Sequence, residues 1–313
     1  MSGIVAVTGA TGFVGRHLID RLVSAGWQVR ALVRRPDADL PSDGVIPVPG
    51  SMEDAESLRR LVEGADHVVH SAGLIKAGSR EEFDRVNGYG TGLLAEACAA
   101  QAAPPRLIYL SSLAARTPEL SDYGASKRLG ETELAERARA LHWTILRPPV
   151  IYGPGDRETL KLFKLMRHGV VPAPNLDGAR MSLIYVGDLC AAVLSLLAAP
   201  VAGGGTFEIS DGCAEGYSWR RLAAAGAEQF GRRVVCFPVP RAFMRLLAGI
   251  NVGLAYLTGG APMITPGKVR EIFHSDWVCH DNPLTRLVDW RPAVMIDEGF
   301  GRTVNWYRCS GWI

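Results

Sequence analysis

Tyr123 and Lys127 stand four residues apart in the stretch YGASK, so they would share one face of a helix. The start of this helix is marked by the sequence Ser-Asp-Tyr, which ends at Tyr123. A phenol has a pKa of about 10 and shuttles protons poorly at neutral pH, but a neighbouring ammonium favours the phenolate. Ser111 and Ser112 end a strand-like run, YLSS, and a serine hydroxyl there could hold a substrate oxygen. Together these residues predict proton transfer at an oxygen of a bound substrate.

Three glycines, Gly9, Gly12 and Gly15, occupy the stretch VTGATGFVG between a strand-like run and a helical pattern. Each glycine costs backbone entropy, so the cluster indicates that something approaches the backbone closely. We expect Gly9 to let the chain turn, Gly12 to admit a diphosphate at the helix N-terminus, and Gly15 to let the helix pack on the strand. A glycine-rich turn without a ligand is the simpler alternative, but the strand before and the helix after favour a dinucleotide.

The end of the second predicted strand bears on which dinucleotide binds. An acidic residue there would bond the ribose hydroxyl of NAD, but this sequence reads ALVRRPD, with Val33 in the acidic place and Arg34 and Arg35 after it. A guanidinium matches the geometry of a phosphate, so these arginines favour NADP over NAD.

The elements that must position these groups alternate regularly along the first half of the chain. Flat β-branched runs predict buried parallel strands, and helical patterns separate them, for example over residues 12–26, 87–101 and 123–140. The strand-like runs begin at Ile4, Gln28, Val45, His67, Arg106 and Trp143. We predict an α/β fold, a doubly wound parallel sheet with a Rossmann domain over 1–150. A smaller substrate-binding part over 151–313 would pack on the carboxyl edge of the sheet.

Composition excludes several classes of partner. With 313 residues, 48% hydrophobic and 21% charged, the chain predicts a folded globular protein, and its net charge of +2 argues against nucleic acid. Six scattered cysteines predict reduced thiols and no metal site. The most apolar stretch, 242–260, carries Arg245 and Asn251, so no spanning segment is expected. The start MSGIVAVTG shows no leader pattern, which favours the cytoplasm.

Seven stretches, in order, carry a family resemblance: TGATGFVG, HVVHSAG, VNGYGTGLLAEA, YLSS, YGASK, LRPPVIYGPGD and SLIYVGDL. The chain resembles the extended short-chain dehydrogenase/reductase family, which includes NAD(P)-dependent epimerases, dehydratases and reductases. The resemblance implies that Ser112, Tyr123 and Lys127 are catalytic, with Asn87 supporting their geometry. It also implies a set of cofactor-binding residues: Gly9, Thr11, Gly12, Phe13, Val14, Gly15, Arg34, Arg35, Ser51, Met52, Ser71, Ala72, Gly73, Ser111, Tyr123, Lys127, Pro148 and Pro149.

Departures from the family pattern bear on the substrate. Many nucleotide-sugar epimerases carry an asparagine where this chain has Val150, and an arginine–aspartate pair where it has Met181 and Ser182. The C-terminal half resembles members that act on hydrophobic alcohols or ketones. A helical run there has an apolar face that would line such a pocket or pack in the core: Phe243, Met244, Leu246, Leu247, Ile250, Leu254 and Leu257.

The leading hypothesis is therefore an oxidoreductase that moves a hydride between NADP and a carbonyl or alcohol carbon of a small hydrophobic substrate. One alternative is an NAD-dependent nucleotide-sugar epimerase or dehydratase that retains its cofactor. A further alternative is a non-catalytic cofactor-binding regulator, which would have no need of the proton-transferring residues. The resemblance also implies a homodimer.

Overall fold

The computed structural model describes residues 3–35, 39–40, 43–138, 141–199, 205–258, 262, 264–280 and 284–313. Two compact units make up the chain. The first comprises Met1–Arg147, Cys190–Phe207 and Arg286–Asp289, and the second comprises Pro148–Leu189, Glu208–Thr285 and Trp290–Ile313. The chain thus leaves the first unit after Arg147 and returns to it twice.

The first unit is built on a seven-stranded sheet with the order β11-β6-β5-β4-β1-β2-β3. Its strands are β1 (Ile4–Thr8), β2 (Gln28–Val33), β3 (Val45–Pro49), β4 (His67–His70), β5 (Arg106–Leu110), β6 (Trp143–Arg147) and β11 (Gly205–Glu208). All neighbours from β3 to β6 pair in parallel, with Val5 opposite both Val29 and His67. The predicted doubly wound parallel sheet is confirmed, and its strand order reverses between β1 and β4, where such sheets bind ligands.

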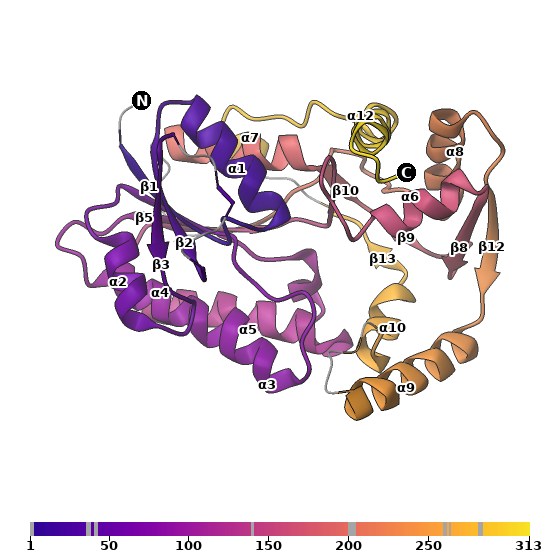
Figure 1. Ribbon diagram of the computed structural model, residues 1–313, viewed down its shortest axis with the longest axis horizontal. Helices are drawn as coiled ribbons and strands as arrows, with labels where there is room; N and C mark the ends of the chain where they lie inside the picture. The colour runs from indigo at the N-terminus through magenta and orange to yellow at the C-terminus, as the bar shows by residue number, and fades with distance from the viewer. Residues whose placement is uncertain are drawn as a thin grey trace. The chain divides into compact units, whose positions relative to one another are not determined.

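Helices cover both faces of this sheet, with α2, α4 and α5 along one face and α1 with α7 along the other (Figure 1). Their bounds are α1 (Phe13–Ser24), α2 (Ala55–Val62), α3 (Arg80–Phe83), α4 (Gly90–Ala99), α5 (Asp122–Arg137) and α7 (Val186–Ala198). A π-helical turn, η1 (Asp84–Tyr89), and two 3-10 turns, η2 (Leu113–Arg116) and η3 (Pro118–Leu120), complete the unit, and α11 (Leu284–Leu287) contributes its last two residues to it. One core joins Leu58, Leu94 and Leu134 of the helices to Leu107 and Ile145 of the sheet.

Helix α1 illustrates why the sequence folds this way locally. Leu18, Ile19 and Leu22 recur at helical spacing and are fully buried. The helix ends before Gly26, whose φ of +86° is in the left-handed region that glycine adopts without strain. Gly26 N–H donates to Val23 O and Trp27 N–H to Leu22 O, which satisfies the last carbonyls of the helix as expected for a C-terminal glycine.

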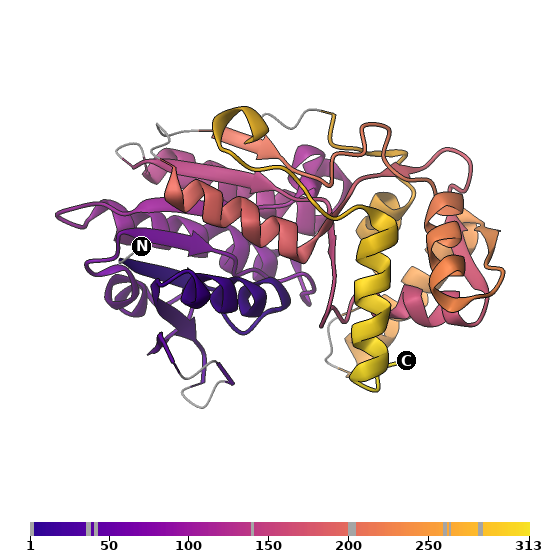
Figure 2. The same cartoon turned by 90° about the horizontal axis from the view of Figure 1, so that it is seen from above.

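The second unit contains three short pairs of parallel strands: β7 (Val150–Tyr152) with β10 (Leu183–Tyr185), β8 (Val170–Pro174) with β12 (Val235–Val239), and β9 (Arg180–Met181) with β13 (Asp276–Trp277). Its helices are α6 (Leu160–Arg167), α8 (Trp219–Phe230), α9 (Arg241–Thr258), α10 (Pro266–Ile272) and α12 (Ile296–Cys309). Helices α8 and α12 lie side by side (Figure 2). The core is aromatic, since Phe163 contacts the rings of both Phe300 and Tyr307.

Candidate active site

The glycine-rich turn follows β1 directly. Gly9 has a φ of +75°, and a Cβ there would stand 2.6 Å from the backbone nitrogen of Ala72, so only glycine fits between this turn and the segment after β4. A Cβ on Gly15 would stand 2.0 Å from Gly9 O, which shows how closely α1 packs on the turn. Gly9 and Gly15 thus have the conformational and packing roles that the sequence predicts.

Gly12 leaves the N-terminus of α1 open. It is the N-cap residue and provides no side-chain cap, and the first turn holds no acidic residue. The first helical hydrogen bond runs from Arg16 N–H to Gly12 O, so the N–H groups of Phe13, Val14 and Gly15 precede the intrahelical ladder. A Cβ on Gly12 would meet only Gly9 O, at 3.2 Å. Such a helix start fits the diphosphate of a dinucleotide.

Arg34 and Arg35 follow the end of β2, and both are exposed. Among the residues that the structure describes, neither arginine has an ion pair or a side-chain hydrogen bond. Arg16, by contrast, pairs with Asp39 at 3.0 Å and donates to Thr11 O. Arg34 and Arg35 therefore remain available to a ligand phosphate.

The segments after β3 and β4 hold five more of the predicted cofactor residues. Met52 is buried and Ser51 is half-buried after β3, where Ser57 Oγ accepts from Ser51 N–H at 3.3 Å. Ser71, Ala72 and Gly73 follow β4, and Ser71 Oγ donates to Thr8 O at 2.7 Å. Because β3 and β4 are parallel to β1, these segments and the glycine turn lie at the carboxyl edge of the same sheet.

Tyr123 and Lys127 lie in the first turns of α5, which begins at Asp122 after the N-cap residue Ser121, as predicted. Ser121 Oγ accepts from Gly124 N–H at 3.0 Å. Ser112 directly follows Ser111 after β5, and its Oγ accepts from Ala114 N–H at the start of η2. The start of α5 packs on η2, since a Cβ on Gly124 would stand 2.7 Å from Ala114 O. The structure therefore brings the segment of Ser112 against the helix of Tyr123 and Lys127.

Lys127 is buried, and its surroundings are well defined. Its Nζ donates to Leu110 O at 2.9 Å and stands 4.5 Å from the centroid of the Tyr109 ring. Burial lowers the pKa of Lys127 to about 7, with a smaller opposing effect of the Glu131 carboxylate. Gly73 lies nearby, because a Cβ on it would stand 3.7 Å from Nζ. The ammonium is thus held between the end of β5 and the segment after β4.

Asn87 connects that segment to α5. Its Oδ1 accepts from Leu74 N–H at 2.7 Å, and its Nδ2 donates to Leu74 O at 2.9 Å and to Ser126 Oγ at 3.0 Å. Ser126 Oγ in turn donates to Tyr123 O at 2.8 Å. Asn87 lies in the π-helical turn η1, although the sequence predicted a regular helix over 87–101; such wide turns often occur at functional sites.

Two buried polar groups that sequence reasoning did not single out complete the surroundings. Glu131 accepts from Ser111 Oγ at 2.6 Å and from Arg147 Nε at 2.8 Å. His70 contacts Thr8 Oγ1 and Thr91 Oγ1 at 2.6 and 2.9 Å, and burial lowers its pKa to about 3, so it is neutral. Glu131 is four residues after Lys127, which places it on the same face of the helix and was the signal available in the sequence.

Pro148 and Pro149, predicted beside the nicotinamide, are the first residues of the second unit. Their place at the cofactor stays a prediction.

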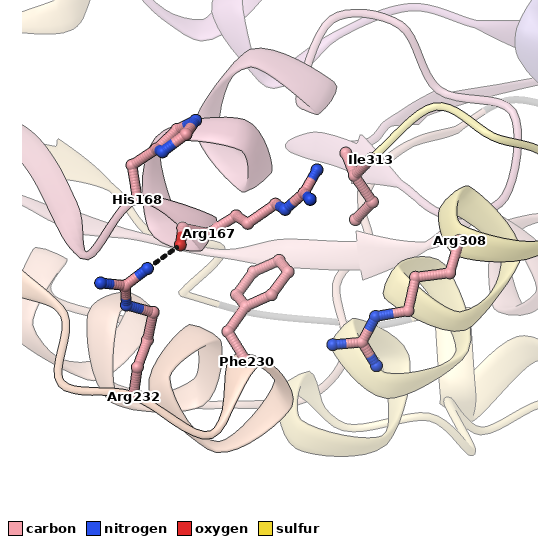
Figure 3. A pocket seen from close by; sticks show the side chains of 6 residues that line it. All are labelled: Arg167, His168, Phe230, Arg232, Arg308 and Ile313. Carbon is pink, nitrogen blue, oxygen red and sulfur yellow. Dashed lines mark hydrogen bonds between the residues drawn. The ribbon is translucent and has the colours of Figure 1, made fainter.

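The second unit also contains a cavity of about 560 Å³ lined by Arg167, His168, Phe230, Arg232, Arg308 and Ile313 (Figure 3). Arg232 donates to Arg167 O at 2.8 Å and Arg308 to Gln229 O at 2.9 Å, so these two arginines bond carbonyls at the ends of α6 and α8. None of the predicted site residues lines this cavity.

Comparisons with known proteins agree with this architecture. Residues 5–210 match the model of the NAD-dependent epimerase/dehydratase family. The chain belongs to this family. It is 40% identical over 316 residues to ceramide reductase of Caulobacter vibrioides, covering 99% of this chain and 96% of that one. The resemblance to extended short-chain dehydrogenases/reductases is thereby confirmed, and the protein is an NAD(P)-dependent oxidoreductase.

One further relative and one solved structure are also similar to the chain. The 2-alkyl-3-oxoalkanoate reductase of Stenotrophomonas maltophilia is 27% identical over 333 residues, covering 95% of this chain and 97% of that one. The solved structure of UDP-glucose 4-epimerase from Thermotoga maritima superposes with a TM-score of 0.72 at 22% identity, and the match covers 99% of each chain. This likeness shows the shared fold.

Proposed function

We propose that the protein is an NADP-dependent reductase of a ketone group in a long-chain, ceramide-type lipid. The observation that carries this proposal is the 40% identity, over nearly the whole of both chains, to ceramide reductase, whose name states a lipid substrate and a reduction. The arrangement of Lys127, Asn87 and the start of α5 supports the chemistry, and Arg34 and Arg35 support the choice of NADP.

In this proposal a reduced nicotinamide, when bound, would supply the hydride that the carbonyl carbon receives, and would be left in its oxidised form. Ser112 Oγ donates a hydrogen bond to the carbonyl oxygen and orients it. The Tyr123 hydroxyl donates its proton to that oxygen as the C–O π bond breaks, so the products are the alcohol and a Tyr123 phenolate that solvent reprotonates. The protonated Lys127 ammonium favours the phenolate of Tyr123. The negative charge of a bound dinucleotide would in turn favour the protonated form of Lys127.

Three positions in the second unit argue against a nucleotide-sugar substrate. Ser182 is fully buried, and its Oγ accepts from Cys279 N–H at 3.0 Å, while Met181 exchanges backbone hydrogen bonds with Tyr217. Both residues therefore serve the framework of the second unit. Val150 offers no polar side-chain atom to a diphosphate.

We also propose that the protein acts in the cytoplasm, and as a homodimer through η1, α4 and α5, the segments that the family resemblance implies.

The decisive experiment incubates purified protein with NADPH and a ketone-bearing ceramide in detergent micelles, and follows NADPH absorbance and the lipid product by mass spectrometry. We expect turnover to fall by about 10²–10⁴-fold in Tyr123→Phe. Tyr89→Phe, the same change at an exposed tyrosine, is the matched control. Unchanged turnover in Tyr123→Phe would contradict the mechanism. Turnover of a UDP-sugar with retained NAD, and none of the ketone, would favour the epimerase alternative.

Cofactor choice is tested by calorimetry on cofactor-stripped protein. We expect NADPH to bind more tightly than NADH, and Arg34→Ala to weaken NADPH binding while leaving NADH binding nearly unchanged. Arg59→Ala, at an exposed arginine of α2 that pairs with Glu56, is the control. Equal affinity for both cofactors in the unaltered protein would overturn the choice of NADP.

A further inference from the structure

Helix α9 exposes its large apolar residues. Phe243, Leu246, Ile250 and Leu254 are 53%, 63%, 52% and 54% exposed. Their spacing of three and four residues places them on one face. A surface helix ordinarily buries such a face against the core, and α9 leaves it exposed. The sequence predicted that this apolar face would pack in the core or line a pocket, but these four side chains do neither. The side chain of Leu257 lies outside those that the structure describes.

Small residues fill the rest of this face. Ala242, Gly249 and Gly253 are exposed between the large side chains, and a Cβ on either glycine would meet nothing within 4 Å. We call these seven residues the α9 face: Ala242, Phe243, Leu246, Gly249, Ile250, Gly253 and Leu254. No charged residue lies within it.

The opposite side of α9 is attached to the second unit. Ala248 is fully buried, and Asn251 Oδ1 accepts from Ile264 N–H at 3.0 Å. The Arg241 guanidinium lies 5.9 Å from the centroid of the Phe273 ring. These contacts fix the rotation of the helix about its axis, so the α9 face points outward because the helix is held that way.

The charge beside the face is positive. Arg245 is exposed and stands three residues after Ala242 and four before Gly249, so it borders the face, and residues 241–258 contain no aspartate or glutamate. We propose that the α9 face binds the surface of an anionic phospholipid bilayer, with the helix lying in the plane of the headgroups. Its apolar residues would enter the acyl boundary, and Arg245 would contact lipid phosphates.

The dimensions of α9 agree with this orientation. Eighteen residues at about 1.5 Å rise give a helix of about 27 Å, long enough to lie along a membrane surface over five turns. Among the described helices, none is long and apolar enough to cross a membrane. An apolar face on a helix that does not span is the pattern of an interfacial helix.

A second copy of the chain is the main competing occupant, because Gly249 and Gly253 would let two helices approach closely. Charge favours the bilayer over this pairing. Two copies of α9 would bring together two copies of Arg245 with no carboxylate on either helix, whereas an anionic lipid surface supplies the missing negative charge. The proposal rests on α9 alone and holds whatever the substrate is; if the lipid substrate is also correct, the enzyme works at the membrane that contains it.

The test measures binding and requires no turnover. The full-length protein is floated with vesicles of phosphatidylcholine containing about one-third phosphatidylglycerol, and with vesicles of phosphatidylcholine alone. We expect binding to the anionic vesicles that weakens with added salt, because screening reduces the arginine contribution. Ile250→Glu should lower the partition coefficient by about tenfold or more, since it removes an inserted side chain and adds a repelled charge.

Matched variants separate this effect from general damage. Ile46→Glu makes the same change at an exposed isoleucine of edge strand β3 and should leave flotation unchanged. Arg245→Ala should weaken binding to anionic vesicles, whereas Arg233→Ala, at another exposed arginine, should not. Thermal melting and NADPH binding confirm that each variant is folded.

Three outcomes would overturn the proposal: no flotation of the unaltered protein with either vesicle, equal flotation of Ile250→Glu, or an equal loss in Ile46→Glu. Light scattering after gel filtration addresses the competing occupant. If Ile250→Glu converts a dimer to a monomer and vesicle binding is absent, the α9 face is an interface between two copies. A failure of lipid-ketone reduction with intact flotation would refute the proposed function and leave this inference standing.

Discussion

Asn87 and Ser126 are joined by a hydrogen bond of 3.0 Å, and this contact links the segment after β4 to the helix that carries Tyr123 and Lys127. Asn87 also bonds both backbone groups of Leu74. Both side chains are buried, so water cannot readily replace either partner. The position of the predicted proton donor relative to the cofactor segment therefore depends on one amide side chain.

Asn87→Ala should lower the free energy of unfolding by about 1–3 kcal/mol, because it leaves the backbone groups of Leu74 and the Ser126 hydroxyl without their partner. We also expect a lower kcat with a smaller change in KM, since the displaced groups act in the reaction and bind little of the substrate. Ser126→Ala removes only the link to α5 and should cost less stability. Urea unfolding and steady-state kinetics on both variants measure this, and an unchanged kcat in Asn87→Ala would contradict the positioning role.

The fold and the outline of the site could be predicted because their signals are local in the sequence. Apolar runs without polar alternation predicted the strands β1 to β6. The glycines of the first turn could be predicted because any chain with this turn makes close backbone contacts there. Ser121 before Asp122 predicted the start of α5, because a hydroxyl at the N-cap position satisfies a free N–H group.

Gly12→Val is expected to separate cofactor binding from folding. The backbone φ of −76° at Gly12 suits any residue, and a Cβ there would meet only Gly9 O at 3.2 Å, so stability should change by less than about 1 kcal/mol. The added side chain would stand at the open start of α1, where a diphosphate is expected to bind. NADPH affinity should therefore fall by about tenfold or more.

Calorimetry with NADPH and thermal melting without it measure the two effects of Gly12→Val. Gly249→Val, at a position with open space around it, is the control for adding the same side chain elsewhere. If Gly12→Val binds NADPH as tightly as the unaltered protein does, the diphosphate is not at the start of α1.

The interactions that sequence reasoning missed are those between distant segments. Nothing near Asn87 identifies Leu74 and Ser126 as its partners, and the Glu131–Arg147 pair joins α5 to β6. The exposed face of α9 was missed for a related reason. Apolar periodicity shows that a helix has an apolar face, but only the surrounding chain decides whether that face is covered.

Lys127→Met should reveal the buried ammonium through the pH dependence of stability. The pKa of Lys127 is about 7 in the folded protein and about 10.4 in an unfolded chain. Between these values the unfolded chain binds more protons, so the free energy of unfolding of the unaltered protein rises with pH relative to Lys127→Met. The difference in the free energy of unfolding between the unaltered protein and Lys127→Met rises by at most about 1.4 kcal/mol per pH unit, and it is constant below about pH 7.

Urea unfolding of both cofactor-free proteins from pH 6 to 9.5 measures this difference, and other titrating groups cancel in it. Lys161→Met, at an exposed lysine of α6, is the matched control for replacing a lysine by methionine. A flat difference for Lys127→Met would mean that the Lys127 ammonium remains charged throughout the range.

Glu131→Gln should be more destabilising than its conservative size suggests. The side chains of Glu131 and Arg147 are only 6% and 12% exposed, and two hydrogen bonds of 2.8 and 2.5 Å join them. Removing the carboxylate charge breaks a buried ion pair on one side, which costs about 3–5 kcal/mol in comparable buried pairs. The pair on the outside of α12, Glu298 with Arg302, is half exposed, and Glu298→Gln should cost less than about 1 kcal/mol.

The double variant Glu131→Gln with Arg147→Met distinguishes the two causes of this loss. If the penalty arises from the broken ion pair, the double variant should recover much of the stability lost in Glu131→Gln, because both charges of the pair are then removed. If it does not recover, the loss arises from the Ser111 hydroxyl, which donates to Glu131 Oε1 at 2.6 Å next to Ser112. In that case kcat should stay low in both variants, since Ser112 would no longer be held for the substrate oxygen.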